Sequence, residues 1–157
     1  MEPKIGIKPK DLSVVTATLN KLLADENVLY IMTRNAHWNV EGKDFHAAHL
    51  FFEAQYNELA IMIDELAERI RTLGHYAVAS MTKYLELTHL TEITDEGNTS
   101  LGYIKELLGA HESIIYSMRE NIESEENLKD SGTEDFVTGM LEKHEKMAWM
   151  LRAHLSK

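Results

Sequence analysis

Cysteine is absent from this chain of 157 residues, which excludes disulfides, cysteine-bound zinc and thiol catalysis. Only two prolines occur, Pro3 and Pro9, and both precede the first periodic segment. Glycine is sparse and falls mostly between periodic segments, which favours long uninterrupted helices. No apolar run approaches the roughly 18 residues of a membrane helix. The first ten residues also lack the apolar stretch of a secretory signal. We therefore expect a cytoplasmic protein with no membrane contact.

Positive charge is also scarce. Lysine and arginine number 16 against 26 acidic residues, so the formal net charge is −10. This balance argues against a general nucleic-acid surface and is compatible with attracting cations. The N-terminal segment offers only Lys4, Lys8 and Lys10, offset by Glu2 and Asp11. DNA binding is therefore not expected.

Apolar residues recur at helical spacing along four long segments. Asp11 or Ser13 is expected to cap the first helix and Asp44 the second, while Gly74 fits the position just after a helix end. The predicted helices are about Asp11–Trp38, Asp44–Leu73, Thr94 or Asn98 to Glu125, and Thr133–Leu155.

The connections between these segments are short, long and short. The long one, His75 to Thr94, exceeds what a structureless loop in a compact domain usually has, and Met81–Leu87 is predicted to form a short helix within it. A single long crossover makes the middle two helices parallel, as in ferritin-like bundles. We predict an all-α, ferritin-like four-helix bundle over residues 11–157, preceded by a short tail over residues 1–10.

Five residues form a candidate ligand set for a divalent metal such as iron: His37, His49, Glu53, Asp64 and Glu68. The last four lie at successive offsets of 4, 11 and 4 in the second predicted helix. At about 100° per residue, those offsets place them within a sector of about 100°. One imidazole and three carboxylates would therefore share one face.

The spacing also constrains how a metal is held. Glu53 and Asp64 are 11 residues apart, or about 16 Å along a helix axis. One metal cannot touch both within a single chain. A site using the whole set needs a second copy of the helix running antiparallel, which predicts an oligomer.

Other interpretations of these residues remain open. The carboxylates can form a solvated acidic face or pair with Arg69 and Arg71 across an interface. His37, taken alone, is more typical of an interfacial histidine that makes a hydrogen bond. Ala60 and Ala67 in the same sector, however, allow another helix to approach closely. Carboxylates enclosed there need a cationic partner, because burying them unpaired is costly.

The segments that carry this set resemble the Dps family of mini-ferritins over essentially the whole chain. They are Asn35-Ala36-His37-Trp38-Asn39-Val40-Glu41-Gly42, then Phe45, His49 and Glu53, then Asp64-Glu65-Leu66-Ala67-Glu68-Arg69. The resemblance implies a homo-dodecameric hollow shell that oxidises Fe²⁺, preferably with hydrogen peroxide, stores ferric mineral and protects against oxidative stress. It also implies di-iron sites shared between two subunits, with His37, His49 and Glu53 from one and Asp64 and Glu68 from the other.

The resemblance suggests further roles. Trp38, expected to be a buried indole, would also quench radicals formed near the iron. Asp130, Glu134 and Asp135 would line three-fold pores through which Fe²⁺ enters. Many members of the family have aspartate where this chain has Glu53, which is longer by one methylene.

Two rival functions are a nucleoid-associated, DNA-protecting shell with little ferroxidase role and a four-helix interaction protein without metal. Among the remaining candidates, Glu86 and His89 have the spacing of an intrachain di-iron ligand pair, but such sites need two of these pairs. His111, His144 and His154 are expected at the surface or an interface.

Overall fold

The computed structural model describes residues 3–92, 97–125 and 130–156, with the side chains of 122–125 excepted, and these ranges contain five helices. No helix in these ranges is both long and apolar enough to cross a membrane. The helices are α1 (Pro9–Asn39), α2 (Phe45–Thr72), α3 (Met81–Leu87), α4 (Ser100–Glu125) and α5 (Ser131–His154).

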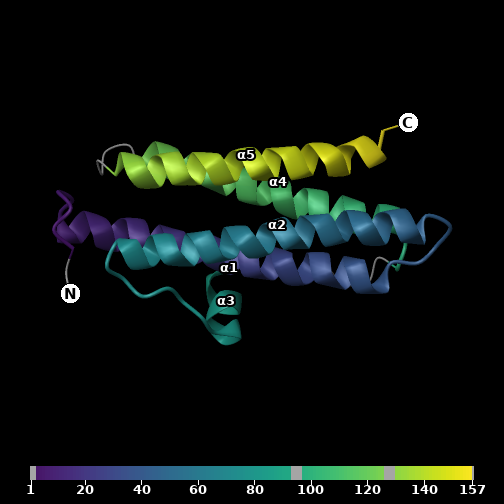
Figure 1. The fold of residues 1–157 in the computed structure, drawn as a ribbon, viewed down its shortest axis with the longest axis horizontal. Helices are drawn as coiled ribbons and strands as arrows, with labels where there is room; N and C mark the ends of the chain where they lie inside the picture. The colour runs from purple at the N-terminus through teal and green to yellow at the C-terminus, as the bar shows by residue number, and fades with distance from the viewer. Residues whose placement is uncertain (1–2, 93–96, 126–129, 157) are drawn as a thin grey trace.

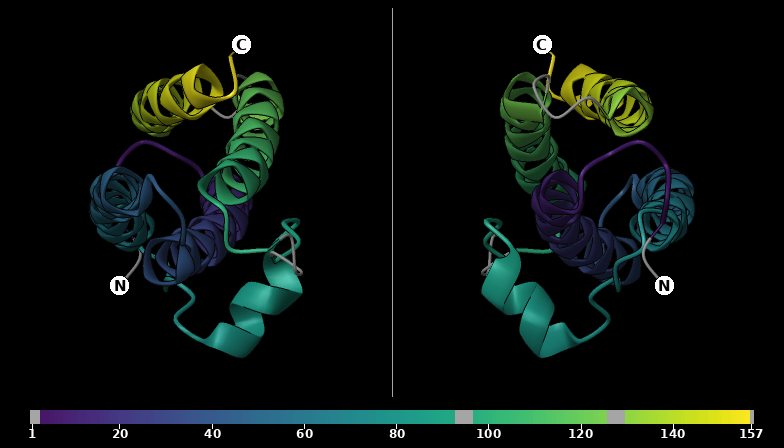
Figure 2. Two further views of the ribbon diagram at one scale, coloured as in Figure 1. Left: turned by 90° about the vertical axis from the view of Figure 1, so that its right-hand side faces the viewer. Right: turned by 90° about the vertical axis from the view of Figure 1, so that its left-hand side faces the viewer.

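The four long helices form a bundle of two antiparallel pairs (Figure 1). α1 packs mainly against α2, and α4 mainly against α5. The crossover returns the chain along the bundle, so that α2 and α4 run in the same direction (Figure 1). α3 lies outside the bundle and packs against α1, as the end views show (Figure 2). The predicted ferritin-like bundle is confirmed, and α3 has the predicted bounds.

The helix ends differ from the predictions in their capping chemistry. α1 begins at Pro9 after Lys8, so the prediction of Asp11 or Ser13 as cap is wrong. Proline suits the first helical turn because its fixed φ is helical and its missing N–H is not needed there. Asp44 does precede α2, but its side chain makes no capping bond and instead accepts a hydrogen bond from Ser100 at the start of α4. The alternative start of the third long helix at Thr94 lies outside the described residues.

The second helix ends as the sequence predicts. Gly74 adopts a φ of +86°, in the left-handed region that glycine tolerates best. The space beside it is filled by Pro3, whose ring would lie 2.5 Å from a Cβ at this position. A side chain here would therefore be both strained and in collision with the N-terminal segment.

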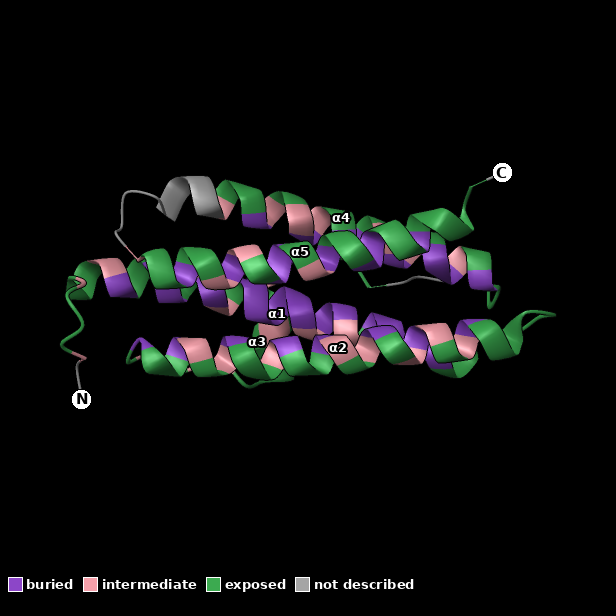
Figure 3. Cartoon of the chain, turned by 45° about the horizontal axis from the view of Figure 1, so that its top comes forward, coloured by how far each residue is buried: buried purple, intermediate pink, exposed green. Residues whose placement is uncertain are grey.

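Buried and exposed residues alternate along α2 and α5 (Figure 3), whereas α1 is buried over a full turn at residues 22–26. The buried residues of α2 include Phe52, Leu59 and Leu66, none of which is exposed to solvent. The interior is not wholly apolar, since Glu26 of α1, His111 of α4 and His144 of α5 are all completely buried. His111 and His144 were expected at a surface or interface; in this chain they lie in the core.

Candidate metal centre

Two of the five predicted ligands are in direct contact at one end of the α1–α2 pair. His37 lies in the last turn of α1 and His49 in the second turn of α2. Their rings stack with centroids 3.8 Å apart and planes 23° from parallel. The short connection between the helices places these two residues, 12 positions apart in sequence, face to face.

Each histidine is held by the backbone of the other. His37 Nδ1 lies 2.9 Å from the carbonyl oxygen of His49, and His49 Nδ1 lies 2.8 Å from the carbonyl oxygen of His37. A carbonyl oxygen only accepts hydrogen bonds, so each Nδ1 carries a proton and donates it. In a neutral ring, the lone pair then resides on Nε2. A backbone carbonyl that fixes the tautomer in this way is one of the common partners of a metal-binding histidine.

Glu53 joins this pair through Tyr56. The Tyr56 ring packs edge-on against the His37 ring at 5.1 Å, and its hydroxyl donates to Glu53 Oε1 at 3.4 Å. Partial burial raises the pKa of Tyr56, and the Glu53 carboxylate raises it further, whereas Arg34 opposes both effects. The phenol therefore stays protonated and available as a donor to Glu53.

Asp64 and Glu68 lie further along α2 and are both exposed. Neither has a hydrogen bond or ion pair with another residue in the described ranges. Within those same ranges, no three histidine or carboxylate side chains of one chain converge on a point where a metal ion would bind. One chain by itself thus presents a histidine pair with a neighbouring glutamate, and two exposed carboxylates at a distance.

Trp38 adjoins this site but is not the buried indole that we expected. It is 60% exposed in the single chain. Arg34 lies over its ring at 4.7 Å and over the ring of Tyr56 at 4.5 Å. The guanidinium therefore links the exposed indole to the aromatic ring that contacts His37 and Glu53, an arrangement in which cation–π attraction holds all three groups together.

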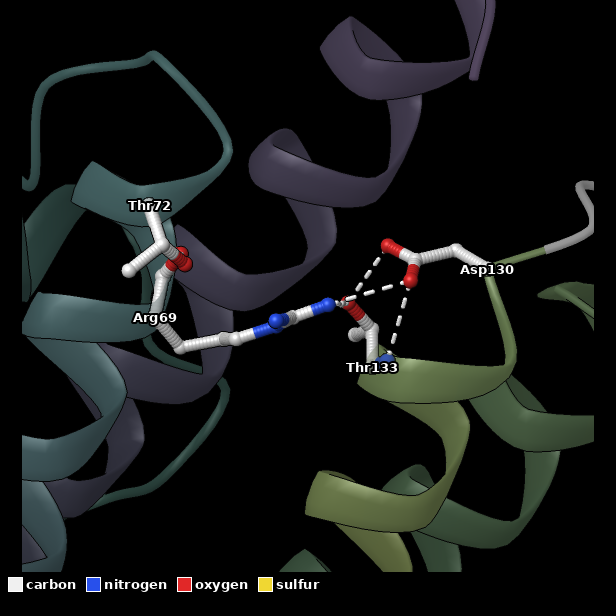
Figure 4. A network of polar contacts seen from close by, with 4 residues as sticks. All are labelled: Arg69, Thr72, Asp130 and Thr133. Carbon is white, nitrogen blue, oxygen red and sulfur yellow. Dashed lines mark hydrogen bonds and ion pairs between the residues drawn. The ribbon is translucent and has the colours of Figure 1, made fainter. Parts of the chain in front are cut away.

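The carboxylate of Asp130 serves the structure of the bundle. It caps α5 by accepting from the Thr133 N–H at 3.1 Å, and it pairs with Arg69 of α2 at 3.0 Å (Figure 4). Only 6% of its side chain is exposed. Glu134, in the first turn of α5, and Asp135, which follows it, are both exposed, in contrast. The pore role of the three residues stays a prediction. Among the described residues, the carboxylates of Glu134 and Asp135 have no ion-pair or side-chain hydrogen-bond partner.

Away from the His37–His49 pair, three polar side chains form a hydrogen-bonded network across the core. Glu26 Oε1 lies 2.7 Å from His144 Nε2, and His144 Nδ1 lies 2.9 Å from His111 Nδ1. Since a carboxylate only accepts, His144 donates from Nε2 and must accept at Nδ1 from His111 when it is neutral. Glu26 Oε2 and His111 Nε2 have no partner within the described residues.

Stability is expected to fall with acidification because of His111. Burial, and secondarily the neighbouring His144, hold the pKa of His111 well below 6.5. Below about pH 6.5 the unfolded chain binds a proton at this residue that the folded chain does not, so stability drops by up to about 1.4 kcal/mol per pH unit until the folded pKa is reached. The contribution is fully present above about pH 6.5.

The control for this effect is His111→Gln, which keeps a polar side chain but cannot titrate. Denaturation midpoints of both proteins should be compared between about pH 7 and pH 5. The wild type should lose more stability than the variant over this interval. Equal losses would show that His111 does not contribute to the acid sensitivity.

Comparisons with known proteins agree with the fold and extend it. The ferritin-like domain family matches residues 16–157. DNA protection during starvation protein 2 of Bacillus anthracis is 38% identical over 143 residues, which are 91% of this chain and 97% of that protein. A DNA protection during starvation protein of Helicobacter pylori is 36% identical over 138 residues, covering 88% of this chain and 96% of the relative.

Solved structures show the same relationship. The crystal structure of the DPS protein from Vibrio cholerae O1 has a TM-score of 0.92 and 33% identity, covering 99% of this chain and 97% of that one. It is described as a member of a broad superfamily of ferritin-like diiron-carboxylate proteins. Dps from Thermosynechococcus elongatus has a TM-score of 0.89 and 34% identity, with 94% of each chain covered. This chain therefore belongs to the ferritin-like proteins and, among them, to the Dps family.

Proposed function

We propose that this protein oxidises Fe²⁺ at sites shared between two subunits, preferably with hydrogen peroxide, and stores the ferric product inside a hollow shell of twelve subunits. Fe²⁺ is the substrate. His37, His49 and Glu53 would bind it from one subunit, and Asp64 and Glu68 from the partner helix. The protein would thereby remove both reactants that generate hydroxyl radicals, which is a protective role under oxidative stress.

The reciprocal hydrogen bonds between His37 and His49 carry the proposal. They use both Nδ1 atoms and both carbonyl groups, and they leave two Nε2 lone pairs at one place. In this tautomer both Nε2 atoms are able to bind a metal ion. The exposed, unpaired Asp64 and Glu68 complement it, because a second α2 running antiparallel would bring their charge to the histidines.

The ligand types account for oxidation and release. Carboxylate oxygens are hard ligands that favour Fe³⁺, whereas two imidazoles are too few to hold Fe²⁺ tightly. Tyr56 donates to Glu53 and would orient that carboxylate while the iron changes charge. The product, Fe³⁺, would then pass into the cavity as mineral, which frees the ligands for further Fe²⁺.

Anaerobic addition of Fe²⁺ followed by hydrogen peroxide tests this function. Two paired irons each give one electron to the two-electron oxidant, so about two Fe²⁺ should be consumed per peroxide, with water as the reduced product. Oxidation by peroxide should be much faster than by oxygen, and His49→Ala should abolish the fast phase. Equal rates with both oxidants, or one Fe²⁺ per peroxide with free hydroxyl radical, would contradict the proposal.

A DNA-protecting shell is the second candidate, and the names of the relatives from Bacillus anthracis and Helicobacter pylori favour it. The charge of this chain opposes it. The formal net charge is −10, and in the segment before α1 Lys4 and Lys8 are partly offset by Glu2. Phosphate contacts from lysine and arginine supply most non-specific DNA affinity, so an acidic charge balance opposes tight binding.

We expect no submicromolar retardation of DNA in a gel shift at neutral pH and moderate salt. The same assay at low salt serves as the control, because weak electrostatic binding strengthens steeply as salt is removed. Tight retardation at moderate salt would favour the DNA-protecting shell.

The cytoplasmic location of the protein stays a prediction.

A further inference from the structure

Outside the histidine pair, three polar residues from separate elements form a chain of hydrogen bonds at the surface. They are Asp25 of α1, His89 just after α3 and Ser113 of α4. His89 Nδ1 lies 2.8 Å from Asp25 Oδ2, and His89 Nε2 lies 3.0 Å from Ser113 Oγ. The order is carboxylate, imidazole, hydroxyl, which is the order of an activated serine nucleophile.

The Asp25 carboxylate at one end of these hydrogen bonds is buried and fixed by several donors. The Asp25 side chain is 3% exposed. Its other oxygen, Oδ1, accepts from the Thr88 hydroxyl at 2.6 Å and from the His89 N–H at 3.0 Å. Because a carboxylate accepts only, His89 Nδ1 must carry a proton, which leaves the Nε2 of a neutral His89 ring to accept from the Ser113 hydroxyl. The tautomer is therefore the one that a general base for Ser113 requires.

The Ser113 hydroxyl at the other end of these hydrogen bonds is accessible. His89 and Ser113 border an open cavity of about 390 Å³ between α4 and the segment that follows α3. Gly109 lies one helical turn before Ser113 and also borders this cavity, and a Cβ placed there would meet no atom within 4 Å. A small acyl group thus has room to approach Ser113 across the bare backbone of α4.

We propose that Ser113 is a nucleophile for small, activated acyl esters, with His89 as its general base and Asp25 as the residue that positions His89. Ser113 Oγ attacks the ester carbonyl carbon while its proton moves to His89 Nε2. The single bond between the carbonyl carbon and the leaving-group oxygen breaks, and His89 returns the proton to the departing alkoxide or phenoxide. Water, deprotonated by His89, then hydrolyses the acyl-serine to a carboxylic acid and regenerates the hydroxyl.

The position of Ser113 inside a helix sets the class of substrate. The peptide N–H groups around it are used in the hydrogen bonds of α4, so no pair of backbone donors is free to stabilise an oxyanion. Each missing donor of that kind costs on the order of 10²–10³ in rate. The site therefore suits esters with good leaving groups, and covalent labelling of Ser113 is a sharper readout than turnover.

The test uses the assembled protein with a fluorophosphonate probe, p-nitrophenyl acetate, and peptide mass spectrometry to locate the adduct. Ser113 should be labelled about a hundredfold faster than Ser117, which lies one turn later on the same helix, since a general base contributes on the order of 10²–10⁴. His89→Ala should reduce labelling of Ser113 to the level of Ser117. Added imidazole should restore part of it, which a merely structural role of His89 would not predict.

Two controls separate the outcomes. Ser117→Ala should leave labelling of Ser113 unchanged, and Ser113→Ala should abolish the fast label while iron oxidation continues at the wild-type rate. Labelling of Ser113 no faster than that of Ser117 would overturn the proposal and leave the three residues as a clamp between α1, the crossover and α4. Loss of labelling in a folded, assembled His89→Ala protein without rescue by imidazole would also overturn it.

Discussion

Subunits with His49→Ala and subunits with Asp64→Ala, each inactive alone, are expected to regain about a quarter of the wild-type ferroxidase sites when they assemble together. In a mixed pair of subunits, one site carries both defects and the other carries neither. The intact site takes His49 from the Asp64→Ala chain and Asp64 from the His49→Ala chain. With random pairing about half of the pairs are mixed, and one of the two sites in each is complete.

The matched control is co-assembly of His49→Ala with Glu53→Ala. Both substitutions lie in the half-site that one subunit supplies, so every site in every mixed pair has a defect and no activity should return. Fe²⁺ oxidation by peroxide measures the active sites, and native mass spectrometry confirms that the particles are mixed. If the first combination recovers no more activity than the second, the sites are not shared in the proposed way.

His144→Ala is expected to destabilise the protein by about 3–5 kcal/mol, the range for breaking a buried ion pair or its hydrogen-bonded equivalent. Glu26 and His144 are both completely buried, and Glu26 Oε1 has His144 as its partner at 2.7 Å. Removal of the imidazole leaves that carboxylate in the core without a donor. The loss is large against the 5–15 kcal/mol that typically stabilises a folded domain.

Guanidinium denaturation at one fixed protein concentration measures the effect, because assembly makes stability concentration-dependent. The control is Glu145→Ala, a neighbour on α5 that pairs with Arg119 at the surface and should cost no more than about 1 kcal/mol. The triple variant Glu26→Leu, His111→Leu and His144→Leu should recover most of the loss, since it removes all three polar groups. Similar losses for His144→Ala and Glu145→Ala would contradict this account.

The two histidine pairs of this chain illustrate different uses of the same side chain. His37 and His49 bond to carbonyl groups through Nδ1 and keep Nε2 available at a partly open site. His111 and His144 bond to each other through Nδ1 within the core, and His144 uses Nε2 for Glu26. The first pair therefore supports the proposed ligand role, and the second pair has a packing and stability role.

The sequence by itself determined the helices and their order. Periodicity of apolar residues predicted the four long helices, and a crossover of unusual length predicted both the parallel α2 and α4 and the short α3. These features are local, since they depend on spacing within a segment and on the reach of the connection. The alignment of His49, Glu53, Asp64 and Glu68 on one helix face was accessible for the same reason, because a helix repeats its directions at fixed intervals.

Tertiary structure decided which polar residues meet. Histidine and glutamate are polar residues that are expected at a surface, and Glu26 is 118 positions from His144 in sequence. No local pattern therefore indicates that Glu26, His111 and His144 meet in the core. The resemblance implies a pore role for Asp130, and only the tertiary structure shows that its carboxylate pairs with Arg69, 61 positions away in sequence.

The residues Asp25, His89 and Ser113 come together only because the crossover packs between α1 and α4. Such contacts depend on how helices pack across long sequence separations, and hydrophobic periodicity carries no information about which polar side chains then face one another.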